Sequence, residues 1–493
     1  MFLRDKLTRF PTLINCLTFG EYYTVRSLSN VVINKLEERI LNTAISKAKN
    51  KEFYDLSYSQ RNIWILSQNR DASIAYNMNA VYEIEGGLQI NQLSKTVRHV
   101  ISKHEALRTN FIEVEGAPKQ KIKRQDEINF EIDILKLSNQ DNIDEIINSI
   151  FYKEFDLQND LLLRIKLLLA EGDKQILIFS THHIIMDGWS IEIFIHDLII
   201  TYNNLIKRDT LDSAHNVVQF KDYSEWLNSQ PLDMKARDFW LQNLKSYKAK
   251  DSFIKDFQKD KISYNGHQIT IAFSKTEKDA LTKLAHSQNC TLFSLLISII
   301  TSFIYKYSGH KDICVGTVDA GRNDKSLSSC IGMFVNTLPL RTKLNEEETF
   351  MQFFDNVNRQ IIETTSYSNC NITDIFPQYA NIFDILVAYQ NPDFNLKDIY
   401  KFENFNLKSI TYGHKVSRFP ILFNFYQNNS NLHCDVDYNT DYYLYSTIEI
   451  IIVKLKKFID GVIKKPSLAI KEYEIKLDIE KKLIENIQID FNF

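Results

Sequence analysis

The spacing of hydrophobic and polar positions changes between residues 180 and 190. Residues 175–180 (QILIFS) form an apolar run, which predicts a buried strand. From residue 190 onward, apolar side chains recur every three or four positions, which predicts a helix. These apolar positions are Ile191, Phe194, Ile195, Leu198, Ile199 and Tyr202. The loop between the two segments therefore joins the end of a strand to the start of a helix.

This loop carries two adjacent histidines, His182 and His183, followed by Asp187 and Gly188. Successive strand residues point to opposite faces, so we expect only one histidine to face a cavity and the other to be structural. A neutral imidazole with a pKa near ~6.5 can accept a proton around neutral pH, which suits acyl transfer to a nucleophile. The alternative interpretation is a packed pair of core histidines beside an Asp-Gly turn.

A second apolar segment, residues 291–304, predicts a buried helix and not a membrane span. Hydroxyl side chains interrupt it, and it is shorter than the ~20 apolar residues that span a bilayer. Near the N-terminus, Arg9, Pro11, Asn15 and Glu21 break any signal-peptide core. We therefore expect a cytoplasmic protein with no membrane contact.

Composition narrows the function classes. The 59 Lys and Arg residues against 62 Asp and Glu residues give a formal net charge of -3, which offers no basis for nucleic-acid binding. The six cysteines show no C-x-x-C spacing, so we expect reduced thiols. Histidine and carboxylate are zinc ligands, but no complete ligand set surrounds His182, His183 and Asp187 at a recognisable spacing, so we expect no metal site.

Six further motifs accompany the His-His-x-x-x-Asp-Gly loop in a fixed order. They occupy residues 56–66, 103–111, 220–226, 321–322, 331–341 and 417–422. In order and spacing these motifs resemble the condensation domain of nonribosomal peptide synthetases, within the chloramphenicol-acetyltransferase-like acyltransferase superfamily. The resemblance runs from about Tyr54 to the C-terminal end. One motif of the family is almost absent from its expected place, residues 369–375 (NCNITDI).

The resemblance implies an α/β fold with two chloramphenicol-acetyltransferase-like lobes, although 493 residues alone would suggest roughly three domains. The lobes are expected to form a V-shaped pseudo-dimer with an active-site tunnel between them. A hinge is expected where residues 228–231 (NSQP) interrupt the patterned segments. The expected divisions are an N-terminal helical appendage or linker at 1–52, an N-terminal lobe with the catalytic loop at 53–226, a C-terminal lobe at 227–474 and a linker tail at 475–493.

The appendage has two interpretations. Residues 19–33 faintly resemble the last helix of a peptidyl carrier domain, so the segment is either a simple helical extension or a carrier-domain remnant. The serine-bearing Gly-Gly-x-Ser turn of a carrier is absent from it. We therefore expect no phosphopantetheine attachment to this segment.

The resemblance also assigns roles to individual residues. His183 is the expected catalytic residue, with His182 packed behind it. Asp187 is expected to pair with Arg322 of the second lobe, both in structural roles at the active site. Gly188 permits backbone conformations closed to other residues, and its amide is a candidate donor to the developing oxyanion. Four more residues are expected along the substrate tunnel: Trp189, Ser190, Met333 and Asn336.

The implied activity is amide bond formation between a donor acyl or aminoacyl thioester and the amine of an acceptor aminoacyl thioester. Donor and acceptor carrier proteins would deliver both substrates on phosphopantetheine arms, so no cofactor is expected on this chain itself. An adjoining adenylation domain is a further expected partner, and we expect a monomer. Residues 75–78 and 185–190 resemble the subtype that joins two L-configured residues.

Several related activities compete with this interpretation. An epimerisation domain shares the histidine motif, but residues 331–337 resemble the condensation version of the later motif. A cyclisation domain does not fit, because aspartates would replace the histidines. The alternatives left open are an ester-forming or free-amine acyltransferase of the same fold, and a catalytically silent scaffold or recruitment domain.

Overall fold

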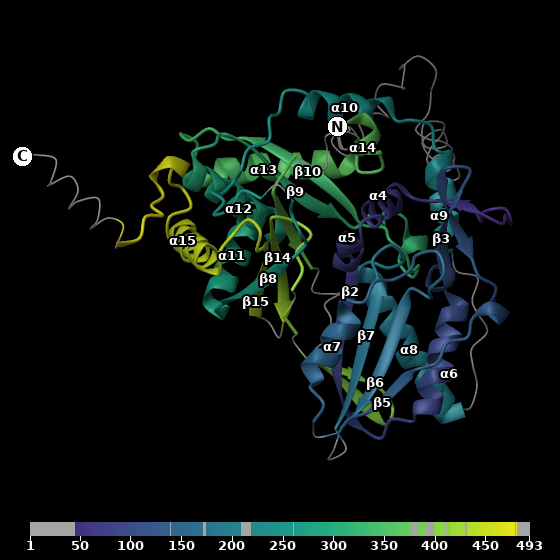
Figure 1. Cartoon of the computed structure of the whole chain (residues 1–493). Coiled ribbons are helices and arrows are strands. Elements are labelled where there is room, and N and C mark those ends of the chain that lie inside the picture. Colours follow the sequence, from purple (N-terminus) through teal and green to yellow (C-terminus); the bar gives the residue numbers. More distant parts are fainter. Residues whose placement is uncertain are drawn as a thin grey trace, which may run out of the picture. The chain divides into compact units, whose positions relative to one another are not determined.

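The computed structural model describes residues 45–138, 140–170, 174–208, 218–259, 261–376, 382–390, 399–410, 412–413, 415–428, 431–478 and 480. The chain divides into two compact units, Met1–Ala48 and Lys49–Phe493. Most of the predicted appendage and most of the predicted tail lie outside the described residues. The architecture below is that of the second unit (Figure 1).

The first lobe is built on a six-stranded sheet with the order β12-β13-β2-β7-β6-β5. Neighbouring strands are antiparallel except β5 and β6, which are parallel. The strands are β2 (Asn77–Gly86), β5 (Asp133–Lys136), β6 (Leu163–Leu169), β7 (Gln175–His182), β12 (Ile399–Lys401) and β13 (Phe405–Ile410).

Helices cover both faces of this sheet because side chains alternate along β7. Ile176 and Ile178 join the cluster under helix α7 (Ile143–Phe151), whereas the Phe179 ring lies 5.5 Å from that of Phe194 in helix α8 (Gly188–Arg208). Helix α6 (Ile90–Lys103) packs beside α8. The predicted strand at residues 175–180 and the helix that follows are both confirmed.

A smaller three-stranded sheet, with the order β1-β4-β3, lies on the same lobe together with short helices. These elements carry the first family motif and the start of the predicted hinge. They are β1 (Tyr54–Asp55), β3 (Thr109–Val114), β4 (Ala117–Ile122), α4 (Tyr58–Leu66), α5 (Arg70–Ala75), α9 (Phe220–Ser229) and the 3-10 helices η1 (Glu105–Arg108) and η2 (Gln125–Glu127).

The second lobe has its own six-stranded sheet, in the order β10-β9-β11-β14-β15-β8. Strand β11 is parallel to both of its neighbours, and the other pairs are antiparallel. The strands are β8 (Gly266–Phe273), β9 (Asp312–Asp319), β10 (Asn336–Lys343), β11 (Ile385–Tyr389), β14 (Ile421–Asn428) and β15 (Asn431–Asn439).

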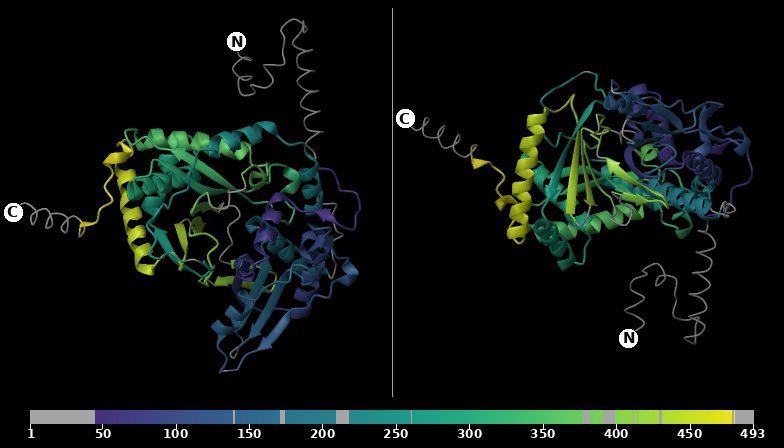
Figure 2. Two further views of the ribbon diagram at one scale, coloured as in Figure 1. Left: turned by 45° about the horizontal axis from the view of Figure 1, so that its top comes forward. Right: turned by 90° about the horizontal axis from the view of Figure 1, so that it is seen from below.

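Side chains of this sheet and of four helices of the lobe form one large apolar core. Figure 2 shows helices beside the sheet from two further sides. Every residue of α12 from Ser294 to Ile304 is buried, so the predicted buried helix is confirmed. The helices of this lobe are α10 (Met234–Leu244), α11 (Lys275–Ser287), α12 (Leu292–Ser308), α13 (Phe350–Ser366), α14 (Ile372–Ile375), α15 (Tyr445–Lys464) and the 3-10 helices η4 (Lys325–Leu327) and η7 (Ile470–Glu472).

One segment from the second part of the chain crosses to the sheet of the first lobe. Strand β13, from the part of the chain assigned to the 227–474 lobe, pairs with β2 of the first lobe, and β12 pairs with β13. A single boundary between residues 226 and 227 therefore does not separate the two sheets. Alternation in a sequence predicts a strand but not its partner, which is why the sequence missed this crossover.

Among the described helices, no single one is long and apolar enough to cross a bilayer. Only α11 and α12 taken together have the required length and composition, and the chain bends by 101° between them.

Candidate functional site

The predicted loop begins where β7 ends at His182 and closes where α8 begins at Gly188. Asp187 precedes the helix and caps it. Its Oδ1 atom accepts hydrogen bonds from the backbone N–H of Ser190 (2.8 Å) and from the Ser190 hydroxyl (2.7 Å). A side-chain acceptor in this position satisfies a backbone donor that the first helical turn leaves unpaired. The loop is therefore anchored at both ends by regular structure.

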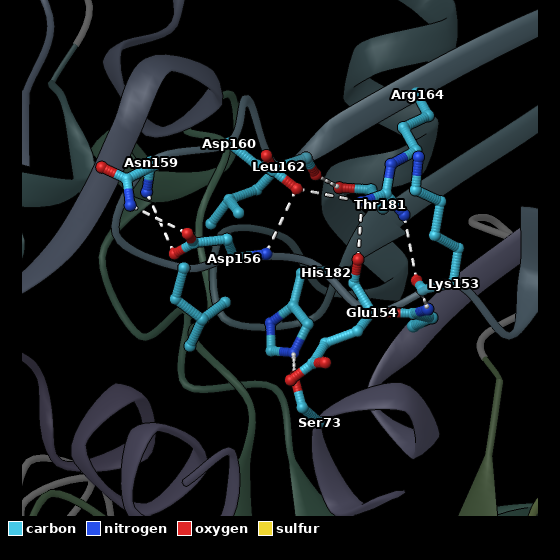
Figure 3. A network of polar contacts seen from close by, with 12 residues as sticks. Ser73, Lys153, Glu154, Asp156, Asn159, Asp160, Leu162, Arg164, Thr181 and His182 are labelled. Atoms are coloured by element: carbon cyan, nitrogen blue, oxygen red, sulfur yellow. Dashed lines mark hydrogen bonds and ion pairs between the residues drawn. The ribbon is translucent and has the colours of Figure 1, made fainter. Parts of the chain in front are cut away.

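His182 is packed inside the first lobe and has no solvent exposure. Its Nδ1 atom accepts the backbone N–H of Ile184 (3.3 Å), which leaves Nε2 as the protonated nitrogen, 3.5 Å from the Ser73 hydroxyl (Figure 3). The Phe155 ring meets it edge-on, and Arg164 lies 3.6 Å over the Phe155 ring. Burial first, and then the neighbouring His183, lower the pKa of His182 to about 3. These contacts hold His182 in the interior of the first lobe, and its structural role stays a prediction.

His183 is half-buried and lines a cavity. Its Nδ1 atom lies 3.1 Å from Sδ of Met333, in the second lobe, and its ring meets that of Tyr76 edge-on. A thioether has no hydrogen to donate, so a hydrogen bond here requires Nδ1 to carry the proton and leaves the Nε2 lone pair as the base. Desolvation first, and then the charge of Arg418, lower the pKa of His183 to about 3. His183 is therefore neutral at physiological pH.

The two histidines make the stability of the fold decrease as the pH falls. Each has a folded-state pKa of about 3, whereas an unfolded histidine titrates near ~6.5. Because the folded state binds fewer protons between these values, each histidine contributes stability that is present above pH ~6.5 and is lost as the pH falls through that window. We expect His182→Gln to reduce the pH dependence of the unfolding free energy by ~1.4 kcal/mol per pH unit. Urea unfolding between about pH 6 and pH 4 measures this, and parallel curves for the two proteins would contradict it.

Asp187 also joins the two lobes. Arg322 Nη2 lies 3.1 Å from Asp187 Oδ1, and the two side chains are only 2% and 0% exposed. Asp187 Oδ2 accepts the backbone N–H of Phe334 at 3.1 Å. The contact predicted between Asp187 and Arg322 is therefore present. We call Asp187, Ser190, Arg322 and Phe334 the interlobe clamp.

Arg322 holds its own loop as well as Asp187. Its Nη1 atom donates to the carbonyl oxygens of Leu327 (2.6 Å) and Cys330 (2.7 Å), and its guanidinium lies 4.1 Å from the centre of the Phe334 ring. Gly321, directly before it, has a φ of +66°, and an added Cβ would lie 2.2 Å from the Phe334 carbonyl oxygen. Glycine alone fits this close approach, so residues 321–334 form a tight loop around the guanidinium.

Two expectations for the loop need correction. Ser190 was expected along the tunnel but is fully buried in the clamp, where its hydroxyl contacts Gly332 O (2.9 Å) and Arg322 Nη2 (2.9 Å). Its side chain turns inward because it completes the cap at Asp187. Gly188 was expected to adopt a conformation closed to other residues, but it is not among the residues with positive φ. A Cβ there would meet nothing within 4 Å, so its lack of a side chain keeps the space above the helix terminus open.

The cavity beside the clamp has a volume of about 1880 Å³ and takes its lining from both lobes. Of the predicted tunnel residues, Trp189, Met333 and Asn336 line it, together with His183 and Gly188. Asn336 Oδ1 accepts the Ser59 hydroxyl at 2.5 Å, which ties the second lobe to α4. The predicted catalytic and tunnel residues other than Ser190 are therefore brought to one cavity.

Two residues near His183 were missed as site residues. Tyr76 accepts the His183 backbone N–H at 2.9 Å through its carbonyl, and the Arg418 guanidinium lies 5.5 Å from the centre of its ring. Tyr76 lies in residues 75–78 and Arg418 in residues 417–422, two segments that resemble the family, so motif membership was the available signal. The divergent segment 369–375 also reaches the cavity, through Cys370 and Asn371.

Neither the cysteines nor the acidic residues of the described part form a reactive or metal-binding cluster. Five cysteines are free and buried there, and the sixth, Cys16, lies outside the described residues. No group of three or more His, Cys, Asp or Glu side chains in these ranges is arranged to hold a metal ion.

Known proteins with similar sequences are peptide synthetases. The chain is 29% identical to surfactin synthase subunit 1 of Bacillus subtilis (strain 168) over 87% of its length, and 30% identical to bacitracin synthase 3 of Bacillus licheniformis over 82%. It spans only 12% and 6% of the length of these two relatives.

Solved structures show the same fold at low sequence identity. A four-domain nonribosomal peptide synthetase matches 90% of the chain with 35% of its own length, a TM-score of 0.78 and 19% identity. The first condensation domain of the calcium-dependent antibiotic synthetase matches 86% of the chain with 99% of its own length, a TM-score of 0.73 and 16% identity. The fold is the α/β, chloramphenicol-acetyltransferase-like pseudo-dimer.

The family model named Condensation domain matches residues 50–485, nearly all of the chain and every motif described above. This protein belongs to the condensation-domain family of nonribosomal peptide synthetases.

Proposed function

We propose that this domain forms a peptide bond between two thioester substrates, by transferring a donor acyl or aminoacyl group to the amine of an aminoacyl acceptor. The observation that carries the proposal is the neutral His183, held in the cavity wall between Met333 and Tyr76 beside the interlobe clamp. Residues 75–78 and 185–190 support the subtype that joins two L-configured residues.

The chemistry follows from the position of each group. The acceptor amine has a pKa near ~7.7–8.0, so a useful fraction is already neutral near neutral pH and can attack the donor carbonyl. A C–N bond forms and the C–S bond breaks. Nε2 of His183 accepts a hydrogen bond from the attacking amine and orients it, and the amine proton passes to the departing thiolate. Gly188 lies at the start of α8, where first-turn N–H groups have no acceptor within the helix, so its amide is placed to stabilise the oxyanion.

The substrates would arrive on phosphopantetheine arms of donor and acceptor carrier proteins, with an adenylation domain as a further neighbour. Neutral amide side chains along the cavity, those of Asn62, Asn79 and Asn336, suit the amide groups of such an arm. The arm supplies the activated thioester. This chain supplies His183, which accepts a hydrogen bond from the amine, and the walls of the cavity. The monomeric state, the cytoplasmic location and the roles of residues 1–52 and 475–493 stay predictions.

The test compares acceptors on one donor. A donor carrier loaded with an L-aminoacyl thioester is mixed with the protein and with an aminoacyl carrier, a hydroxyacyl carrier or a free amino acid. Intact-protein mass spectrometry follows the loss of the donor group. We expect fast discharge only with the aminoacyl carrier. Faster discharge with the hydroxyacyl carrier or the free amine would establish one of the alternative acyltransferases, and no protein-dependent discharge with any acceptor would support a scaffold.

A further inference from the structure

A carboxylate that forms no ion pair within the described residues lies in the wall of the cavity. Asp319 ends strand β9, is half-buried and lines the cavity shared by the lobes. Its Oδ2 atom is buried and hydrogen-bonds to no group in the described part of the chain. Burying one oxygen of a carboxylate without a donor costs free energy. The rest of the half-buried side chain lies in the cavity lining, where a ligand can approach the carboxylate.

The surroundings of Asp319 are mostly neutral. It lies directly opposite Asn336 in the β9–β10 pair, so the two side chains project from the same face. Burial first, and then the charge of Asp319, raise the pKa of Tyr223, which places that phenol within electrostatic reach of the carboxylate. The cation nearest in sequence, Arg322, is committed to Asp187. Asp319 therefore keeps an available charge close to the cavity.

Two further residues of the cavity lining, Ser368 and Asn371, each bury one side-chain atom that makes no hydrogen bond within the described residues. Ser368 is 3% exposed and Asn371 is 8% exposed, and neither the Ser368 hydroxyl oxygen nor the Asn371 Nδ2 atom finds a hydrogen bond within the described residues. Asn336 connects this group to Asp319, because its Nδ2 atom donates to the Ser368 carbonyl at 3.4 Å. Buried polar groups in proteins are normally paired, so these unpaired atoms give this wall of the cavity a polar character.

We propose that Asp319 binds the cationic side chain of a basic aminoacyl substrate, and so selects substrates with an ammonium or guanidinium group for the peptide bond formation proposed above. A charge-assisted hydrogen bond to a carboxylate is stronger than a neutral one. Pairing with Asp319 also keeps a side-chain amine protonated and unreactive. The α-amine, with its lower pKa, then remains the nucleophile.

The β9–β10 pair links Asp319 to the proposed chemistry. Met333, which contacts His183, is three residues from Asn336, the cross-strand partner of Asp319. A substrate bound to His183 at its reactive end therefore has Asp319 along the same wall. This makes Asp319 a specificity-determining residue, not a catalytic one.

Binding of unreactive analogues tests the proposal without requiring turnover. Lysyl and norleucyl groups are joined to pantetheine through an amide in place of the thioester, and dissociation constants are measured by calorimetry. We expect the wild-type protein to prefer the lysyl analogue by about 10- to 100-fold, and Asp319→Asn to bring the ratio close to one. Both analogues carry the same α-amine, so the ratio reports the side chain alone.

The matched control is Asp435→Asn. Asp435 lines the cavity from β15, three strands away from β9 in the sheet, and accepts the Thr270 hydroxyl at 2.7 Å. It should retain the lysyl preference, and Asp319→Glu should retain it in part. Thermal unfolding of each variant checks that the fold is intact. Three results would overturn the proposal. They are equal affinities of the wild-type protein for the two analogues, an equal loss of affinity for both analogues in Asp319→Asn, and loss of the lysyl preference in Asp435→Asn.

Condensation assays then show whether Asp319 binds the side chain of the donor or of the acceptor. The lysyl or norleucyl group is placed on the donor carrier in one series and on the acceptor carrier in the other. A preference in either series that Asp319→Asn abolishes identifies the source of the cation. If the analogues bind with the expected preference but no peptide forms, the proposed function fails and the specificity stands. If the lysyl and norleucyl substrates condensed at equal rates within each of the two series, the proposed specificity alone would be overturned.

Discussion

Replacing His183 with alanine is expected to lower the rate of peptide bond formation by about 10²- to 10⁴-fold while leaving the fold intact. His183 faces the cavity and is half-buried, and its ring contacts the side chains of Met333 and Tyr76. Its loss therefore removes the hydrogen-bond acceptor that orients the amine. Single-turnover assays with preloaded carriers measure the rate, and thermal unfolding measures the fold.

His182 supplies the matched control, because it is the same residue type one position away. It is fully buried against Ser73, Ile184 and Phe155. His182→Ala should lower the unfolding free energy by a few kcal/mol, as expected for a cavity with an unpaired donor. A near wild-type rate for His183→Ala would remove His183 from catalysis. A large loss of stability in that variant would instead make it structural.

Breaking the interlobe clamp is expected to cost ~3–5 kcal/mol for either Asp187→Ala or Arg322→Ala, because each change leaves an opposite charge buried without its partner. The double variant should cost less than the sum of the two. A double-mutant cycle by denaturant unfolding gives the coupling energy. Both single variants should also slow condensation, since Asp187 caps α8 and fixes the loop that carries His183.

The pair formed by Asp312 and Arg341 is the control for charge removal alone. Its atoms approach to 2.6 Å in the second lobe, and the Asp312 side chain is 39% exposed. Arg341→Ala should therefore lower stability by less than Arg322→Ala and should leave condensation near its wild-type rate. Additive effects for Asp187 and Arg322 would show that the clamp does not couple the two residues. Equal slowing by Arg341→Ala would show that the loop does not depend on the clamp.

Local patterns predicted the elements around the loop well, because burial and spacing are local properties. The apolar run at 175–180 became β7, the helical spacing after Ser190 became α8, and the apolar segment at 291–304 became the buried α12. The alternation of side chains along a strand predicted that only one of the two histidines faces the cavity. The Asp187–Arg322 contact joins residues 135 positions apart, and only the family resemblance pointed to it.

What the sequence left out depends on pairing in three dimensions. Strand β13 crosses to the first lobe because its partner is β2, and no spacing rule encodes that choice. Ser190 is turned inward by hydrogen bonds to Gly332 and Arg322, which lie far from it in the chain. In the sequence, Asp319 is one of many polar residues at strand ends. Only the structure shows that its Oδ2 atom is buried with no hydrogen-bond partner in the described residues.

The mass of the acceptor carrier after one turnover is the most direct test of peptide bond formation by this domain. A donor carrier and an acceptor carrier, each loaded with an L-aminoacyl group, are incubated with the wild-type protein and with His183→Ala. We predict that the wild-type protein moves the donor group onto the acceptor carrier, whose mass then equals that of its dipeptidyl form, and that His183→Ala forms this species about 10²- to 10⁴-fold more slowly. An acceptor carrier of unchanged mass with the wild-type protein, or equal rates for the two proteins, would contradict catalysis by His183.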